Sequence, residues 1–185
     1  MTRWYEDTET DTPFPLGAHT FTADEIVAFA RTYDPRYLHA DPQAARDGPF
    51  GGLVASPWHA VAVGHRIMVE RLALEAETIR ENGGTPGEPG PSPGVDAIDF
   101  AAPVRPGDTV SYALTVTGKR LSRSIPGWGL LFNRVEGFNQ RGEMVYRADI
   151  VGFSKLRDYR MPWHIKFALA AKRLAQNLST LRSNP

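Results

Sequence analysis

Apolar residues recur at helical spacing through the first half of the chain and alternate with polar residues through much of the second half. A lead-in strand is expected up to Phe21, in a polar and aromatic segment interrupted by prolines. Thr22 followed three residues later by Glu25 has the spacing of a capping box, which predicts a helix start. Pro35 ends this helix near Asp34. Its apolar face is formed by Ile26, Phe29, Ala30 and Tyr33.

Two further helices are each predicted by an N-cap residue followed by proline. The first is short and runs from Asp41 to Gly48. The second is the longest of the chain and covers 57–80, with Ser56 as its N-cap. Its predicted apolar face consists of Trp58, Val61, Ala62, His65, Met68, Val69 and Leu72. Small residues crowd its first half, which indicates that another element approaches closely: Ala60, Ala62 and Gly64.

A loop rich in glycine and proline, 82–94, separates these helices from a predicted antiparallel sheet. The last 25 residues return to helical spacing. We therefore expect an α+β fold in which a long central helix is wrapped by an antiparallel sheet. One domain would cover 1–160, and a helical extension would cover 161–185. The predicted strands of the second half are Ile98–Ala102, Thr109–Lys119, Gly129–Asn139 and Glu143–Ser154.

The composition mainly excludes certain classes of function and of chemical site. Lysine and arginine number 21, and aspartate and glutamate also number 21, so the formal net charge is zero. Balanced charge argues against binding to the phosphate backbone of nucleic acid. The absence of cysteine excludes disulfides, thiolate metal sites and cysteine nucleophiles. No secretory signal or bilayer-spanning apolar run is evident, so we expect a cytoplasmic protein that does not bind membranes.

The candidate chemistry lies in the predicted loop between the first two helices. Asp34 and His39 stand five residues apart, and in a loop two such side chains can turn toward one point. A carboxylate and an imidazole that share a water can move protons in both directions at neutral pH. Asp41 follows closely, but its expected role as an N-cap and the lack of a third ligand argue against a metal.

In the order and spacing of four of its segments, the sequence resembles the MaoC-like dehydratase family, whose members include the (R)-specific enoyl-CoA hydratases. The resemblance implies a single hot-dog domain and extends with weaker matches to about residue 155. It also implies a homodimer, because the family forms its acyl tunnel and active site at a two-fold interface. The segments that carry the resemblance are 4–7, 29–41, 50–56 and 103–109.

The resemblance assigns the catalytic dyad to Asp34 and His39. The implied reaction is reversible addition of water across a trans-2-enoyl thioester, giving the (R)-3-hydroxyacyl thioester. Coenzyme A or an acyl carrier protein would carry the acyl group, and no cofactor is implied besides this thioester substrate. One dyad member would act on the water and the other would move the proton at the α-carbon, with the assignment between them left open.

Three positions depart from the family pattern: Pro57, Arg36, and Tyr37, which stands where the family commonly has a loop proline. Pro57 stands where the family usually has a glycine whose amide donates to the thioester oxygen, and proline has no N–H. The amides of Trp58 or His59, or the hydroxyl of Ser56, would have to replace that donor; otherwise hydratase activity would be weak or absent. Arg36 replaces a smaller polar residue, and it is expected to lower the pKa of the nearby Asp34 carboxyl.

The remaining candidates and rival functions are weaker. Lys119, Arg120 and Arg123 are candidates for contacts with the phosphates of coenzyme A, although charged residues at a strand end are commonly only solvated. A hot-dog thioesterase is the rival enzyme, but such enzymes lack the paired aspartate and histidine. A non-catalytic acyl-binding or partner subunit of the same fold is the rival from another class.

Overall fold

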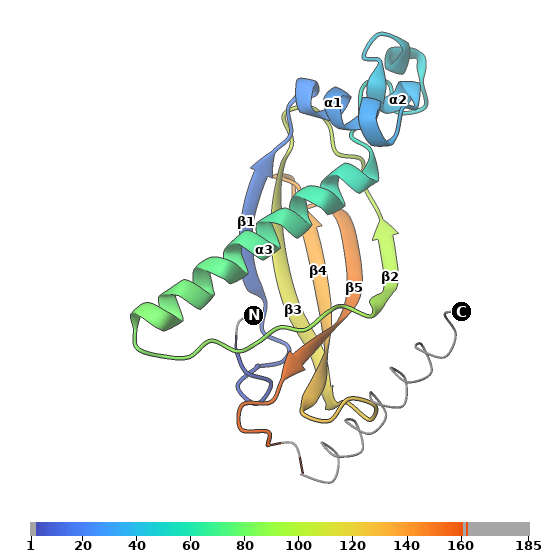
Figure 1. Ribbon diagram of the computed structural model, residues 1–185. Helices are drawn as coiled ribbons and strands as arrows, with labels where there is room; N and C mark the ends of the chain where they lie inside the picture. Colours follow the sequence, from blue (N-terminus) through green and yellow to red (C-terminus); the bar gives the residue numbers. More distant parts are fainter. Residues whose placement is uncertain (1–2, 161, 163–185) are drawn as a thin grey trace, which may run out of the picture.

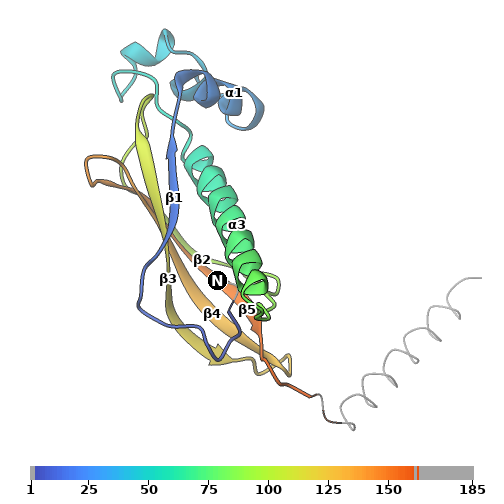
Figure 2. The same ribbon diagram turned by 90° about the vertical axis from the view of Figure 1, so that its left-hand side faces the viewer.

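The computed structural model describes residues 3–160 and 162. Its core is one antiparallel sheet of five strands in the order β1-β3-β4-β5-β2, and the long helix α3 lies across one face of it (Figures 1 and 2). This is the α+β hot-dog architecture that the sequence predicts. The strands are β1 Phe14–Thr20, β2 Gly94–Phe100, β3 Thr109–Leu121, β4 Trp128–Phe138 and β5 Met144–Lys155. The helices are α1 Ala23–Tyr33, α2 Tyr37–Ala40, the 3₁₀ turn η1 Ala44–Asp47 and α3 Pro57–Glu81.

The strands match their predicted ranges closely, apart from β2. Alternation of apolar and polar residues in β3 produces alternating burial. Short loops, 122–127 and 139–143, connect β3 to β4 and β4 to β5. Gly142 in the second of these loops has φ 77°, a conformation that favours glycine. β2 begins at Gly94 rather than at Ile98, because pairing with β5 extends it into the segment predicted to be a loop.

The start of α1 uses half of the predicted capping box. Thr22 Oγ1 accepts a hydrogen bond from the Glu25 amide at 3.2 Å. The Glu25 carboxylate turns instead to His19, whose Nε2 lies 2.8 Å from Glu25 Oε1. The helix boundaries are therefore predicted correctly, while one side chain of the motif makes a different contact.

The segment between α1 and α3 is more helical than predicted. His39 was expected in a loop but lies in the single-turn helix α2, where it is buried. The helix predicted from Asp41 to Gly48 is shortened to the 3₁₀ turn η1. Asp41 nevertheless caps the turn as expected, because its Oδ1 accepts from the amides of Gln43 and Ala44.

The face of α3 that packs on the sheet differs from the predicted one. Trp58 and Val69, both assigned to the buried face, are 54% and 52% exposed. The small residues decide the orientation: a Cβ added at Gly64 would lie 2.6 Å from Tyr146 Oη and 2.8 Å from the Tyr112 ring. The close approach predicted from the small residues is therefore confirmed at Ala60 and Gly64, which are buried, whereas Ala62 is exposed. The buried residues of α3 are His59, Ala60, Val63, Gly64 and Ala76.

The predicted helical extension, 161–185, lies outside the described residues except for residue 162. Within the described part of the chain, none of the helices is long and apolar enough to cross a membrane.

Candidate functional site

The site lies at the end of the sheet covered by α1 and α2, where the chain enters α3 (Figure 1). Asp34 is the C-cap of α1, and its amide donates to Ala30 O at 2.9 Å. Pro35 stops the helix, and the Arg36 amide then donates back to Asp34 O at 2.8 Å. This tight turn starts α2 one residue later, so that His39 returns toward Asp34. The local sequence thus folds both candidate side chains into one place.

Asp34 has three hydrogen-bond donors. Arg36 Nε donates to Oδ1 at 2.7 Å and Arg36 Nη2 donates to Oδ2 at 2.6 Å, in a two-point ion pair. The Ser56 hydroxyl donates to the same Oδ2 at 2.7 Å. The Asp34 side chain is 12% exposed, whereas that of Arg36 is 60% exposed. One oxygen of Asp34 therefore joins the α1–α2 turn to the start of α3.

His39 is buried and faces Asp34. Its Nε2 lies 3.6 Å from Asp34 Oδ2, and its Nδ1 lies 2.8 Å from the carbonyl oxygen of Val54. A carbonyl oxygen can only accept, so Nδ1 carries a hydrogen and donates to Val54. In a neutral imidazole the lone pair is then on Nε2, the atom that faces the carboxylate.

The charges of the site favour an ionised Asp34. The hydrogen bonds from Arg36 are the main cause, and the bond from Ser56 adds to them. Together they outweigh burial and hold the pKa of Asp34 at about 2. The direction agrees with the expectation from the sequence.

The start of α3 leaves one candidate donor free for a thioester oxygen. Ser56 occupies the N-cap position as predicted, but its hydroxyl caps no amide and is used on Asp34. The His59 amide donates to Ser56 O at 2.9 Å. Pro57 has no N–H. Among the described residues no protein group accepts from the Trp58 amide, which lies at the positive end of the helix dipole.

His59, predicted as a further binding residue, lies in the packing between α1 and α3. Its ring stacks on Phe29 with centroids 4.4 Å apart and meets the edge of Phe21 at 5.1 Å. Burial lowers its pKa, and within the described residues its Nδ1 has no hydrogen-bond partner. A neutral packing residue describes these contacts better than a substrate contact does.

A small cavity of about 30 Å³ adjoins Ser56 and Pro57. Its remaining wall is formed mainly by Phe100, Pro103 and Val145. This volume holds about one water molecule, so the cavity does not by itself accommodate an acyl chain.

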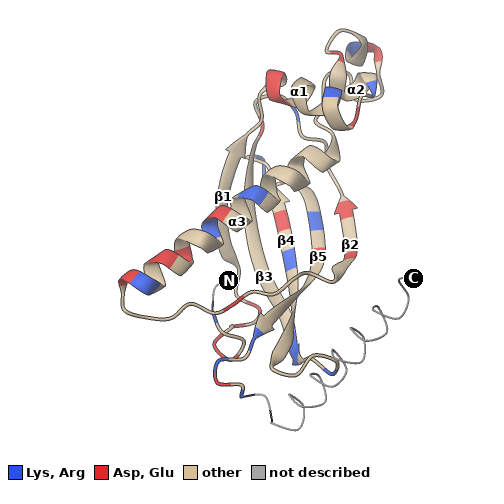
Figure 3. Cartoon of the chain, in the orientation of Figure 1, with Lys and Arg blue, Asp and Glu red and all other residues tan. Residues whose placement is uncertain are grey.

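The basic residues proposed for coenzyme A phosphates lie at the far end of the sheet. β3 runs from Thr109, beside Thr20, to Leu121 at the opposite end, and its last residues include Lys119 and Arg120 (Figure 3). Lys119 Nζ donates to three backbone carbonyls of the N-terminal segment, those of Tyr5, Glu6 and Thr8. Its ammonium group therefore has a structural role. Arg120 makes a long contact to Leu121 O at 3.4 Å, and Arg123 is exposed.

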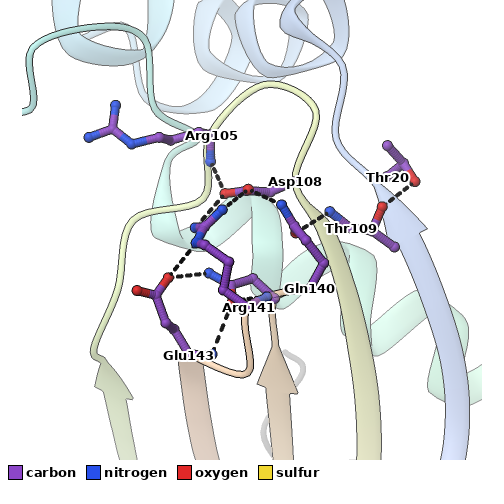
Figure 4. Close-up of polar contacts among 8 residues, drawn as sticks. Thr20, Arg105, Asp108, Thr109, Gln140, Arg141 and Glu143 are labelled. Atoms are coloured by element: carbon purple, nitrogen blue, oxygen red, sulfur yellow. Dashed lines mark hydrogen bonds and ion pairs between the residues drawn. The ribbon is translucent and has the colours of Figure 1, made fainter.

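A buried network around Asp108 was not predicted. Its carboxylate accepts from the Arg105 amide, from Gln140 Nε2 and from Arg141 Nη1, each at 2.8 Å (Figure 4). Arg105 also reaches Phe50 O at 2.8 Å and so ties the loop that leads into α3. The Pro-Gly-Asp turn before β3 was noted only as part of a motif. An aspartate in a turn just before a buried strand is the signal for such a structural role.

No group of three or more potential metal-ligating side chains comes together within residues 3–160. The MaoC-like domain model matches residues 7–127, well over half of the chain. The chain belongs to the MaoC-like domain family. The matched region contains the Asp34 turn, α3 and the Asp108 turn.

Similar proteins agree with this membership. The chain is 26% identical over 127 residues to the uncharacterized protein YdeM of Bacillus subtilis, covering 69% of this chain and 81% of YdeM. A MaoC-like dehydratase from Rhodospirillum rubrum has 28% identity and a TM-score of 0.69, covering 84% of this chain and 99% of that one. The (R)-hydratase from A. caviae involved in PHA biosynthesis shares the fold, with a TM-score of 0.51 and 22% identity over 82% of this chain and 99% of that one.

Proposed function

We propose that this chain hydrates trans-2-enoyl thioesters to (R)-3-hydroxyacyl thioesters and catalyses the reverse dehydration. The observation that carries the proposal is the pairing of Asp34 Oδ2 with His39 Nε2, 3.6 Å apart beside the start of α3. Two groups at this separation can contact the same water, and one of them can take its proton. Membership of the MaoC-like family and the fold shared with an (R)-hydratase support this reaction class.

The reaction needs proton transfer and stabilisation of the negative charge on the thioester oxygen, and the site has groups for both. Proton transfer by a positioned side chain contributes roughly 10²–10⁴-fold. Water addition also places negative charge on the thioester oxygen, which a preorganised donor must stabilise. The Trp58 amide at the start of α3 is the donor that we assign to this oxygen, replacing the amide that Pro57 lacks. Addition of water balances without an oxidant or a reductant, so the proposal includes no cofactor.

We further propose that the working form is a homodimer acting on a thioester of coenzyme A or an acyl carrier protein. The cavity beside Ser56 holds only about one water, so a single chain does not enclose an acyl group there. β1 and β2 are also the two edge strands of the sheet and leave backbone groups unpaired along their outer sides. A second subunit would cover an edge and complete the substrate tunnel.

A second candidate is a non-catalytic acyl-binding or partner subunit. Two observations favour it: Pro57 lacks the amide expected at its position, and Arg36 occupies both oxygens of Asp34. In this case the protein would bind an acyl thioester without adding water.

One experiment separates these functions from thioester hydrolysis. Purified protein is mixed with crotonyl-CoA, and loss of the enoyl absorbance is followed alongside release of free thiol. We expect loss of the enoyl signal without thiol release, and its reduction to the background rate in His39→Ala. Thiol release without hydration indicates a thioesterase. Binding of acyl-CoA without either reaction, over several chain lengths, indicates the non-catalytic subunit.

A further inference from the structure

Arg36 restricts what the Asp34 carboxylate can do. Its guanidinium occupies Oδ1 and Oδ2 from one side, and the Ser56 hydroxyl occupies Oδ2 from another. The ion pair is formed within one tight turn, in which the Arg36 amide donates to Asp34 O. Because only Pro35 separates the partners, the pair forms at little cost in chain entropy.

The His39 ring is held with Nδ1 toward Val54 O and Nε2 toward Asp34. Donation of Nδ1–H to Val54 O leaves the lone pair of the neutral ring on Nε2. When the ring is neutral, Nε2 and the Asp34 carboxylate face each other as two acceptors, with Nε2 and Oδ2 3.6 Å apart, and share no hydrogen bond. A proton that arrives at Nε2 turns it into a cationic donor beside the carboxylate, a charge-assisted arrangement that stabilises the protonated ring.

We propose that Arg36 and Ser56 hold Asp34 as a fixed anion throughout the reaction, and that His39 alone moves the proton. This inference rests on the proposed hydration. Asp34 would stabilise the charge on the protonated ring. Arg36 would be a positioning residue that acts through Asp34, and it would not contact the substrate.

The hydration reaction balances with His39 as the only group that carries a proton. His39 Nε2 takes a proton from water as the water oxygen forms its bond to the β-carbon. The electron pair of the carbon–carbon double bond moves to the α-carbon and the thioester oxygen, giving an enolate. The Nε2–H bond then breaks as the same proton is delivered to the α-carbon, which restores the thioester carbonyl and the neutral imidazole. Delivery from one group on one face gives syn addition.

The electrostatics of the turn agree with this division of roles. In the described part of the chain, the charged and titratable groups that act on Asp34 are Arg36 and His39. Arg36, and to a lesser extent Ser56, lower the pKa of Asp34 to about 2. A carboxyl with such a pKa stays ionised at neutral pH and is poorly suited to donating a proton to carbon.

The test compares four variants on crotonyl-CoA, with kcat/KM measured across pH. We expect His39→Gln to lose at least about 10³-fold and Asp34→Ala to lose roughly 10²-fold. Alanine is used at position 34 because an asparagine amide would itself donate to Nε2. Arg36→Gln is expected to lower kcat by about tenfold, with KM changed less than about twofold. The double variant Asp34→Ala/Arg36→Gln should match Asp34→Ala, because Arg36 acts only through Asp34.

The pH profile gives a readout that a purely structural role would not change. Arg36→Gln removes a positive charge beside the dyad, so protonation of the dyad becomes easier. The acid limb of kcat/KM should move up by roughly 0.5–1 pH unit. Arg46→Gln is the matched control, because Arg46 is an exposed cation in the neighbouring turn η1. We expect its profile to equal that of the wild type.

Three results would overturn the inference. Equal losses in Asp34→Ala and His39→Gln would mean that both groups move protons. An unchanged acid limb in Arg36→Gln, or additive losses in the double variant, would mean that Arg36 does not act through Asp34. A different result would contradict the proposed hydration itself: the wild type would then not hydrate crotonyl-CoA, and the role assigned to His39 would be wrong as well.

Discussion

Two aspartate–arginine pairs lie at the same end of the molecule. Their contacts are similar, but one pair has a structural role and the other belongs to the candidate active site. Asp108 is 3% exposed and pairs with Arg141, 33 positions away, on the turn between β4 and β5. Asp34 pairs with Arg36, only two positions away, and the arginine is 60% exposed. Both carboxyls have a lowered pKa. In Asp108, hydrogen bonds from Arg141, Arg105 and Gln140 outweigh the effect of burial.

The difference lies in what each aspartate connects. Donors to Asp108 come from the turn before β3 and from the β4–β5 turn, so the carboxylate joins parts of the sheet that are distant in sequence (Figure 4). Donors to Asp34 leave one side facing a histidine that has a free acceptor nitrogen. A structural carboxylate therefore joins segments that are distant in sequence, whereas the candidate functional carboxylate has a local ion pair and faces a histidine. The pKa shift alone does not distinguish the two, because both pKa values are lowered.

The largest expected effect on stability is at Asp108, whose side chain is buried although its partner Arg141 is 45% exposed. Asp108→Ala leaves the Arg141 guanidinium, the Gln140 amide and the Arg105 N–H without their shared acceptor. We expect the free energy of unfolding to fall by about 3 kcal/mol, mainly because the Arg105 N–H and the Gln140 amide lose their buried acceptor, while Arg141 keeps its contact with Glu143. Asp34→Ala should cost about 1 kcal/mol, because its arginine is already solvated. Urea unfolding of both variants measures the difference, and equal losses would contradict the comparison.

Single donors to each aspartate give a smaller and more discriminating contrast. Ser56→Ala removes the hydroxyl donor to Asp34, and Gln140→Ala removes the amide donor to Asp108. Each is expected to cost about 0.5–1 kcal/mol of stability. Only Ser56→Ala should also lower the rate of crotonyl-CoA hydration, by about tenfold. An equal loss of rate in Gln140→Ala, measured well below its unfolding transition, would show that the two networks are not separate.

The smallest effect is on the pH dependence of stability. Asp34 has a folded pKa of about 2 against an ordinary value of 3.8, so its ion pair stabilises the fold above about pH 4. That stabilisation is lost as the pH falls from 3.8 toward 2. Arg36→Gln should therefore be about 1 kcal/mol less stable than the wild type at pH 6, after allowing for the exposure of Arg36.

Urea unfolding at a series of pH values measures the difference in stability between wild type and Arg36→Gln. The other carboxyl groups are common to both proteins, so their titration does not contribute to the difference. The gap between wild type and Arg36→Gln should narrow steadily as the pH falls from about 4 toward 2. A gap that stays constant down to pH 2.5 would show that the Arg36–Asp34 ion pair is not its source. This measurement does not depend on catalytic activity.

Local patterns predict much of the fold. Alternation and turn residues place the strands, and the Thr22 cap and Pro35 bound α1 correctly. The orientation of α3 was predicted only in part: Val61 and Met68 pack against the core as expected, whereas Trp58 and Val69 are exposed. Contact with the Tyr112 and Tyr146 side chains instead requires Gly64 at the interface. Which side of a helix is buried depends on partners that are distant in sequence.

The candidate site was predictable to a similar extent. The convergence of Asp34 and His39 follows from a short turn; their spacing allowed it and the family resemblance assigned the pair, although His39 lies in α2 and not in the expected loop. The bond from Ser56 to Asp34 spans 22 positions and depends on how α3 meets the α1–α2 turn, so the sequence predicted only an N-cap role for Ser56. Elimination of the Ser56 and His59 donors, which leaves the Trp58 amide, likewise required the three-dimensional contacts.

The most direct test of the proposed activity is the chirality of the product. Wild type and His39→Gln are incubated with crotonyl-CoA, and the 3-hydroxybutyryl-CoA formed is resolved into its two enantiomers. We predict the (R) product from the wild type and only background hydration from His39→Gln. Formation of the (S) product, or equal yields of the (R) product from both proteins, would contradict the assignment of the reaction to this site.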